Sequence, residues 1–161
     1  MKLYNVEDNY VDFLKTFDSK VPDNKIEKRP FVGVVFTISG YNFFAPLSSP
    51  KLKHRRMSNA ADFHKINGGS QGAINFNNMI PIPNSELILI DIDNITDEDY
   101  KNLLNSQLRF INSVQEILKK KAEKLYRLVG SDDRILSNNQ IKIKQRCINF
   151  GLLQEKMQEF K

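Results

Sequence analysis

A nearly continuous apolar run, residues 31–38, constrains the fold of this chain more than any other feature. The run is rich in Val, Ile and Phe and is apolar at odd and even positions alike, which is typical of a strand buried on both faces of a sheet. Ser39 and Gly40 follow it, and residues 41–45 have the composition of a second strand. The segment therefore predicts a β-hairpin around a tight glycine turn, with its first strand central in a larger sheet.

The other periodic segments come as strands first and helices later. Apolar residues at helical spacing mark residues 9–17, which Asp8 is expected to cap, and a longer buried stripe that ends near Gly130. In chain order, we expect strands over residues 2–6, 31–38, 41–45, 73–82 and 86–92, helices over 9–17 and 152–160, and a long helical segment opened by residues 93–96. We expect loops over residues 46–72, with one short element around 63–66, and over 131–140. This order predicts an α+β fold with helices packed on a mostly antiparallel sheet.

The chain has the length and composition of one ordinary globular domain. Its 161 residues suffice for a hydrophobic core, and no repeat, low-complexity linker or Gly/Pro-rich hinge divides them, so we expect a single domain over residues 1–161. The longest apolar run is strand-sized, and acidic residues follow the N-terminus too early for a secretory signal. The single cysteine, Cys147, excludes an internal disulfide and a zinc site built from several thiolates. We expect a cytoplasmic protein.

Charge is distributed unevenly along the chain, whose net charge is +5 and whose pI is about 9.3. Residues 51–66 hold five Lys or Arg against one acidic residue, whereas residues 67–100 hold six acidic residues and no Lys or Arg. Residues 101–161 are basic again. This pattern favours a basic surface for a polyanion such as RNA or DNA, and a solvated surface without a partner is an equal alternative.

The loop after the hairpin concentrates side chains that can do phosphate chemistry. A short stretch holds two hydroxyls and five basic groups, and two more basic residues follow it: Ser48, Ser49, Lys51, Lys53, His54, Arg55, Arg56, then His64 and Lys65. Cutting RNA without a metal requires help in deprotonating the 2′-hydroxyl, positive donors for the phosphorane and an acid for the leaving 5′-oxygen. These residue types can supply all three. From composition alone, a solvated basic loop is the favoured alternative.

Other kinds of site lack the residues that they need. The chain has no glycine-rich phosphate loop followed by Lys and Ser/Thr, and no Gly-x-Ser-x-Gly elbow. Its two histidines are too few for a metal centre, and the aspartates over residues 91–99 are expected to cap a helix. We therefore expect neither a metal nor a cofactor.

Several segments, in order, carry a resemblance over nearly the whole chain. They cover residues 3–22, 28–35, 44–51, 72–81, 107–111 and 149–161. The most specific is the run Ala45 to Lys51, which reads APLSSPK. On these segments the chain resembles the ToxN/AbiQ family, the endoribonuclease toxins of type III toxin–antitoxin and abortive-infection systems.

The resemblance implies a fold and an activity. The fold would be a twisted antiparallel sheet like the core of the Kid/MazF RNA interferases, elaborated by helices. The activity would be metal-independent cutting of RNA that leaves 2′,3′-cyclic phosphate and 5′-hydroxyl ends. The partner would be a repeat RNA antitoxin, which the toxin processes into pseudoknots that fill its basic groove, commonly in a cyclic protein–RNA assembly.

The resemblance also assigns residues. Ser49 matches the family's essential serine, Lys51 its accompanying lysine and Ser48 a Ser-or-Thr position. Tyr10 and Arg29 are further matches, and a core aromatic is the alternative role of Tyr10. One more match falls either on His64, as an acid or base, or on Lys65, as an RNA contact. The expected phosphate or RNA contacts in the loop are Lys53, His54, Arg55 and Arg56, and His54 is expected to be exposed. Lys120 and Lys121, in the basic strip over residues 119–124, are also expected to contact RNA, with a solvated helix face as the alternative.

A second class of function stays open at this point, a non-catalytic RNA- or DNA-binding module that uses the same basic loop. Such a module needs the cations but not Ser49, whereas catalysis requires the serine.

Overall fold

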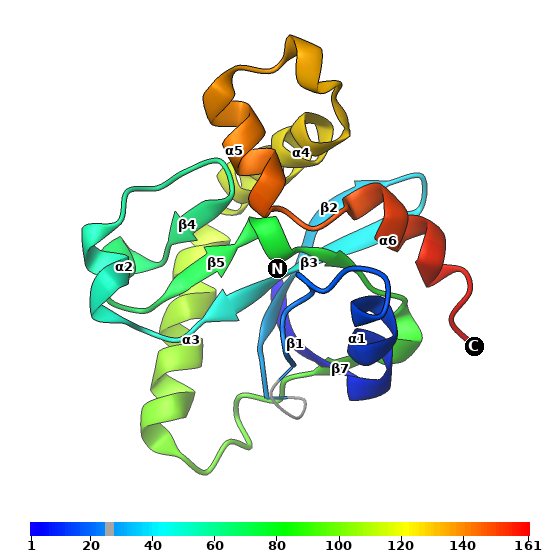
Figure 1. Cartoon of the computed structure of the whole chain (residues 1–161). Helices are drawn as coiled ribbons and strands as arrows, with labels where there is room; N and C mark the ends of the chain where they lie inside the picture. The colour runs from blue at the N-terminus through cyan, green and yellow to red at the C-terminus, as the bar shows by residue number, and fades with distance from the viewer. Residues whose placement is uncertain (25–27) are drawn as a thin grey trace.

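The computed structural model of the chain describes residues 1–24 and 28–161, and within these residues the strands form one antiparallel sheet. Its path is β4-β5-β3-β2-β1-β7, with β6 paired to β3. The strands are β1 (Lys2–Val6), β2 (Phe31–Ile38), β3 (Tyr41–Ser48), β4 (Phe63–Lys65), β5 (Ala73–Asn75), β6 (Ile80–Pro81) and β7 (Leu87–Leu89). Helices lie around this sheet (Figure 1), which confirms the predicted α+β class.

The predicted hairpin is confirmed as the centre of the sheet. Strands β2 and β3 pair from Phe31↔Pro46 to Ile38↔Tyr41, and both turn residues have positive φ, 51° at Ser39 and 83° at Gly40. Glycine adopts this backbone conformation without a steric penalty, which is why the turn is tight. Strand β3 continues beyond the predicted end to Ser48, so the sheet carries the first serine of the loop directly.

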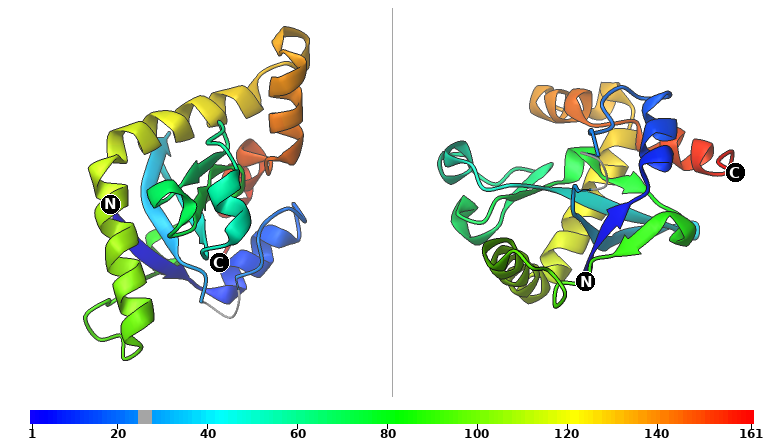
Figure 2. Two further views of the ribbon diagram at one scale, coloured as in Figure 1. Left: turned by 90° about the vertical axis from the view of Figure 1, so that its left-hand side faces the viewer. Right: turned by 90° about the horizontal axis from the view of Figure 1, so that it is seen from below.

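Helices cover both faces of the sheet. They are α1 (Asp8–Lys15), α2 (Leu52–Arg56), α3 (Glu98–Ser113), α4 (Gln115–Gly130), α5 (Asn138–Arg146) and α6 (Phe150–Met157). Figures 1 and 2 show α3 on one face and α1 with α6 on the other, with α4 crossing one end of the strands. The buried apolar side chains of sheet and helices form one cluster that includes Phe43, Ile74 and Leu118. No helix in the described parts of the chain is long and apolar enough to span a bilayer.

Several predicted boundaries are wrong. The long helical segment breaks at Val114, whose φ of −121° and ψ of 16° are not helical, so α3 and α4 are separate helices. Residues 73–82 contain two short strands separated by a 3₁₀ turn, because a turn over residues 76–78 interrupts the ladder. Asp8 is the first residue of α1 and Glu7 occupies its N-cap position.

The structure also contains elements that the sequence pattern missed. Helix α5 begins inside the polar loop expected over residues 131–140 and continues through residues to which no element was assigned, and a capping box between Ser137 and Gln140 starts it. Its only buried residue is Ile143, so it lacks the apolar stripe by which helices are recognised. Helix α2 also lies inside the expected loop over residues 46–72, whereas strand β4 coincides with the short element expected around residues 63–66.

Candidate active site

The sheet positions the serine loop, residues 48–51, at the end of β3. Ser48 pairs with Ala73 of β5, and its carbonyl oxygen lies against Gly72, where an added Cβ would be 2.0 Å from it. Gly72 has a φ of +92°, so both its conformation and the close approach require glycine. The chain then leaves the sheet through the exposed residues Ser49, Pro50 and Lys51.

The Ser48 hydroxyl is held by a neighbouring strand. Asn75 Nδ2 donates to Ser48 Oγ at 2.5 Å. Residues that pair directly across antiparallel strands share a face of the sheet, and so do alternate residues along one strand. The pairs Ser48↔Ala73 and Phe63↔Asn75 therefore place Ser48, Asn75 and Phe63 on one face.

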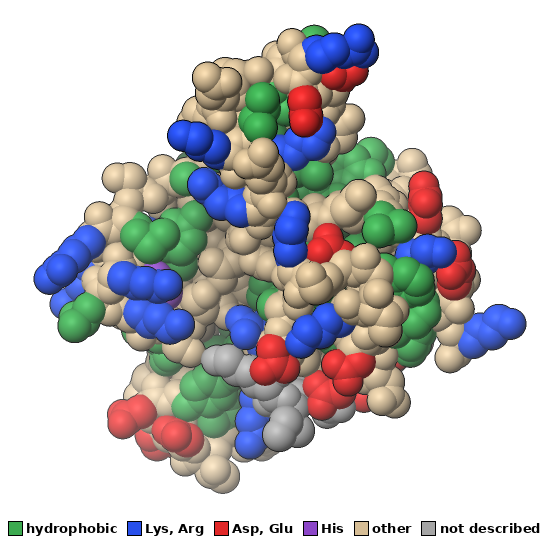
Figure 3. Space-filling view, in the orientation of Figure 1, with side chains coloured by type: hydrophobic (Ala, Val, Ile, Leu, Met, Phe, Trp, Pro, Cys, Tyr) green, Lys and Arg blue, Asp and Glu red, His purple; other side chains and the backbone are tan. Residues whose placement is uncertain are grey.

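This face opens into a cleft of about 440 Å³, which we call the Ser48 cleft. Three expected residues line it together with Ser48, namely Lys51, Lys53 and His54. The rest of its wall comes from Met57, Ser58, Ala60, Asp62, Phe63, Asn75, Asn77 and Arg146. Lys and Arg side chains gather over the adjacent helix α2 (Figure 3), so the cleft lies beside a strongly positive surface.

Ser49 lines a second, narrower crevice of about 60 Å³ on the other side of the serine loop. Arg29 lies there, with its Nε donating to the carbonyl oxygen of Asp23 at 2.6 Å. Burial lowers the pKa of Arg29, and Asp23 opposes that shift. Ser48 lines both the cleft and the crevice, so Arg29 and Lys51 lie in two recesses that meet at the serine loop.

The structure does not bring His64 to the serines. His64 pairs with Ile74, and Ile74 pairs with Leu47, so these three side chains share one face of the sheet. Leu47 and Ser48 are consecutive in β3, so that face is the one opposite Ser48. His64 is 9% exposed, and its Nδ1 lies 3.3 Å from Lys121 Nζ. Burial, and then the Lys121 ammonium, lower the pKa of His64 to about 4. Lys65, the other candidate at this position, pairs with Ala73 and shares the face of Ser48.

Two more expected RNA contacts are buried in this structure. Tyr10 is fully buried and its hydroxyl donates to the Pro81 carbonyl oxygen at 2.5 Å, so it occupies the alternative role of a core aromatic. His54 was expected to be exposed, and this is wrong, since only 2% of it is accessible. The centroid of its ring lies 5.7 Å from that of Phe63, a residue of β4. Burial and the ammonium groups of Lys53 and Lys51 lower its pKa.

The remaining basic residues divide into exposed and internal groups. Lys53, Arg55 and Arg56 are exposed on α2, and Lys120 is exposed on α4. Lys121 is different, because its Nζ donates to the carbonyl oxygens of Ala60 and Phe63 at 2.8 and 3.1 Å. It therefore anchors β4 to α4 and does not belong to a solvated strip.

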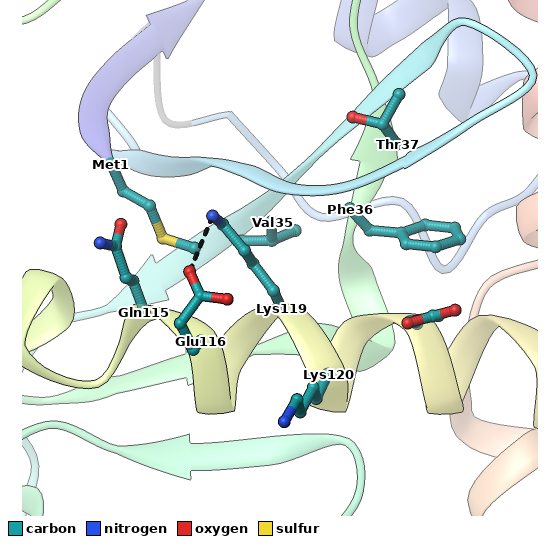
Figure 4. Close-up of a pocket in the computed structure, with 9 residues that line it drawn as sticks. Met1, Val35, Phe36, Thr37, Gln115, Glu116, Lys119 and Lys120 are labelled. Carbon is teal, nitrogen blue, oxygen red and sulfur yellow. Dashed lines mark hydrogen bonds and ion pairs between the residues drawn. The ribbon is translucent and has the colours of Figure 1, made fainter.

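A larger cleft of about 740 Å³ lies between β2 and α4, away from the serine loop. Figure 4 shows Lys119 and Lys120 on its helical wall, with Lys119 Nζ paired to Glu116 at 3.0 Å. Glu123 also lines it. Its mixed charge distinguishes it from the Ser48 cleft and makes it a poorer match for a polyanion.

The sequence patterns missed Arg146 and Asp62 in the wall of the Ser48 cleft. Arg146 Nε and Nη2 donate to the two carboxylate oxygens of Asp62 at 2.6 and 3.0 Å. Asp62 is 4% exposed. A separation of 84 residues between these partners leaves no local signal by which the pair could have been found.

The acidic segment over residues 91–99 has the expected structural role. Asp97 caps α3 by accepting from Tyr100 N at 3.0 Å, and Asp91 accepts from Asn94. Across residues 1–24 and 28–161, no three His, Cys, Asp or Glu side chains group as metal ligands would.

Comparison with known proteins gives a consistent result over the whole chain. A family model for the toxin ToxN of type III toxin–antitoxin systems matches residues 2–158. The endoribonuclease ToxN of Pectobacterium atrosepticum is 34% identical over 99% of this chain and 94% of its own length. The endoribonuclease ToxN of Bacillus thuringiensis subsp. kurstaki is 35% identical over 99% and 84%, respectively.

Solved structures agree with this comparison. One, of a type III system whose toxin is selectively inhibited by a non-coding RNA pseudoknot, superposes with a TM-score of 0.85 at 34% identity over 98% of this chain and 96% of that chain. The structure of AbiQ, a lactococcal anti-phage endoribonuclease of the same type of system, superposes with a TM-score of 0.78 at 25% identity over 98% and 96%. By both sequence and structure, the chain belongs to the ToxN family of endoribonuclease toxins from type III toxin–antitoxin systems.

Proposed function

We propose that the serine loop is the centre at which this toxin cuts RNA without a metal, leaving 2′,3′-cyclic phosphate and 5′-hydroxyl ends. The observation that carries the proposal is the position of Ser48 between two basic recesses, one holding Arg29 and the other Lys51. A scissile phosphate at the loop meets hydroxyl and cationic donors from both sides. Such an arrangement stabilises the charge that develops on a phosphorane.

Each group has a role in the reaction. The 2′-hydroxyl oxygen attacks the adjacent phosphorus and loses its proton to solvent water, while the bond from phosphorus to the 5′-oxygen breaks and that oxygen takes up a proton from Lys51. Ser49 orients the attacking hydroxyl or the phosphate, because a serine hydroxyl is too weak an acid to act as an unaided base. Lys51 donates to the non-bridging oxygens and protonates the leaving oxygen, while Ser48, oriented by Asn75, donates a further hydrogen bond.

The flanking RNA is held by exposed cations. Lys53, Arg55 and Arg56 on α2, with Lys65 and Arg29, contact phosphates on either side of the cut. Among the described residues none of the three α2 cations takes part in an ion pair, so their full charge is available to a polyanion.

The antitoxin RNA binds over the same surface, the Ser48 cleft and the exposed cations of α2. A pseudoknot RNA inhibits the toxin of a structural relative at 34% identity, which supports a repeat RNA antitoxin as the partner of this chain. Occupation of the basic groove by that RNA would block the serine loop, and copies of toxin and RNA would close into a ring. The toxin acts in the cytoplasm, where both its cellular or phage substrates and the antitoxin transcript occur.

The experiment is RNA cleavage in EDTA by purified, RNA-free protein, with mapping of the new ends. Wild type should produce 2′,3′-cyclic phosphate ends, Ser49→Ala should lose cutting while still binding RNA, and Ser85→Ala, a change at an exposed position away from the loop, should cut normally. Cutting by Ser49→Ala at the wild-type rate contradicts the assignment of the centre. A folded wild type that binds RNA without cutting it supports the non-catalytic binding module, and a requirement for a divalent metal contradicts the mechanism.

A further inference from the structure

The wall of the Ser48 cleft contains apolar groups as well as polar ones. The cleft lies directly beside the serine loop, yet its wall includes apolar groups from Met57, Ala60 and Phe63 and the carboxamides of Asn75 and Asn77. A phosphate needs only positive charge and hydrogen-bond donors, whereas a nucleobase offers an apolar face together with a polar edge. The composition of this wall therefore matches a base, next to a loop that holds the scissile phosphate.

Arg146 is the polar group of the cleft whose position is most strongly determined. Both oxygens of the buried Asp62 carboxylate bind its Nε and Nη2, while the Arg146 side chain remains 54% exposed. This geometry uses one edge of the guanidinium. The other edge, Nη1 with the second hydrogen of Nη2, has no hydrogen-bond partner among the described residues and is available to a ligand.

The backbone around Arg146 is held as firmly as its side chain. Asn77 Nδ2 donates to the Arg146 carbonyl oxygen at 3.4 Å, and Ile148 N donates to the Asn77 carbonyl oxygen at 3.0 Å. Asn77 N in turn donates to the Asp62 carbonyl oxygen at 3.3 Å. The end of α5 is thus tied to the turn over residues 76–78 and to the segment before β4, so the guanidinium is preorganised before RNA arrives.

The donors of the cleft favour a purine. A guanidinium edge donates to two adjacent acceptors, N7 and O6, on the Hoogsteen edge of guanine and to the single acceptor N7 on that of adenine, whereas the corresponding edge of a pyrimidine has no ring-nitrogen acceptor. Asn75 keeps its carbonyl oxygen and a second amide hydrogen for the amino or carbonyl group beside N7. We propose that the Ser48 cleft binds a purine next to the scissile phosphate and that Arg146, positioned by Asp62, reads its Hoogsteen edge. This inference rests on the proposed function of the serine loop.

The test combines an atomic change in the RNA with a change in the protein. A short RNA with a mapped cut is prepared with 7-deazapurines, which lack N7, at one position at a time. For wild type, one position next to the cut should lower kcat/KM about tenfold, which is the size of effect expected when one hydrogen bond to a base edge is removed. Arg146→Gln should show that loss with the ordinary RNA and no further loss with the 7-deazapurine.

Two further variants separate base reading from charge. Arg146→Lys keeps the charge but not the paired donors of the guanidinium edge, and it should lose the sensitivity to 7-deazapurine as Arg146→Gln does. Asp62→Asn should weaken that sensitivity if Asp62 is a positioning residue, an effect that a general loss of stability would not produce. The matched control is Arg134→Gln, because Arg134 also forms a two-pronged pair with an aspartate, Asp132, but on an exposed surface away from the cleft. It should retain the full sensitivity.

The inference fails if no 7-deazapurine position affects wild type, or if Arg146→Gln lowers cutting equally for all bases and remains sensitive to 7-deazapurine, which is the behaviour of a phosphate contact. Binding of the same series made as uncleavable 2′-O-methyl RNA gives a second measurement of the same preference. If wild type binds the 2′-O-methyl RNAs with this preference but does not cut the unmodified RNA, the base site stands and the proposed catalysis fails. If wild type cuts the unmodified RNA but no 7-deazapurine changes its cutting or its binding, only the base site fails.

Discussion

Lys121 and His64 form an internal pair, with Nζ of the lysine 3.3 Å from Nδ1 of the imidazole. A lysine ammonium is only a donor, so Nδ1 accepts and the imidazole is neutral, with its proton on Nε2. The pair lies on the face of the sheet opposite Ser48. It joins α4 to β4, and its properties are therefore those of a structural contact.

The depressed pKa of His64 predicts a pH-dependent stability. Its pKa is about 4 in the folded chain against 6.5 for the free side chain, so between these values the unfolded chain binds the extra proton. The free energy of unfolding should fall as the pH drops from 6.5 to 4, by at most about 3 kcal/mol from this group. Urea unfolding of wild type and His64→Gln across this range measures it. Identical pH profiles for the two proteins would contradict the prediction.

Removing the Lys121 ammonium should destabilise the fold. Lys121→Met keeps most of the apolar stem but leaves the carbonyl oxygens of Ala60 and Phe63 without this donor, which should cost about 1–3 kcal/mol. NMR titration should also show a higher pKa for His64, because a neighbouring positive charge is removed. Lys120→Met, at the exposed adjacent position, is the control and should leave both quantities near wild type. Equal stability of the two variants would rule out the anchoring role.

The hydrogen bond between Asn75 and Ser48 should matter for cutting. Asn75→Ala removes the donor that orients the Ser48 hydroxyl, and we expect RNA cleavage to fall about tenfold or more, since one oriented hydrogen bond contributes on that scale. Ser48→Ala and the double variant complete a cycle in which the two losses should not add. Asn42→Ala, in the remote end of the hairpin, is the control. Additive losses would show that the two residues act independently.

Gly72 should be irreplaceable for a reason that differs from simple backbone strain. Gly40 and Gly72 have similar φ values, +83° and +92°, but a Cβ at Gly40 meets no atom within 4 Å whereas one at Gly72 lies 2.0 Å from the Ser48 carbonyl oxygen. Gly72→Ala should therefore destabilise the chain by about 1–3 kcal/mol more than Gly40→Ala and should displace the serine loop. Thermal or urea unfolding compares the two variants directly, and equal losses of stability would mean that the close approach relaxes freely.

The exposed lysines of α4 should contribute to RNA affinity without affecting chemistry. Replacing Lys120 and Lys124 by Gln should weaken RNA binding and lower the salt slope of log K by about 0.7–0.9 for each phosphate that the variant no longer neutralises, with the cutting rate at saturating RNA unchanged. The control carries the same charge change at Lys15 and Lys161, which are exposed in other parts of the chain. An unchanged affinity for the first variant, or an equal decrease in both, would exclude the strip as an RNA-binding surface.

Local features of the sequence were sufficient for the centre of the fold. The apolar run over residues 31–38 and the Ser39-Gly40 turn predicted the β2–β3 hairpin because strand burial and turn conformation depend on neighbouring residues. The boundaries failed where the local signal was weak. Helix α5 has only one buried residue, and the break at Val114 is marked by neither glycine nor proline.

The sequence by itself determined the hairpin and the place of the serine loop at the end of a buried strand, since these depend on residues close together in the chain. It also determined the family, since the resemblance consists of short motifs matched in order along the chain. Only the tertiary structure decided which side chains face the cleft. Strand pairing turned His64 away from Ser48, and the packing of α5 brought Arg146 to Asp62 from 84 residues away. The physical reason is that a side chain's partners depend on how distant segments pack, and neither hydrophobic periodicity nor turn chemistry records that packing.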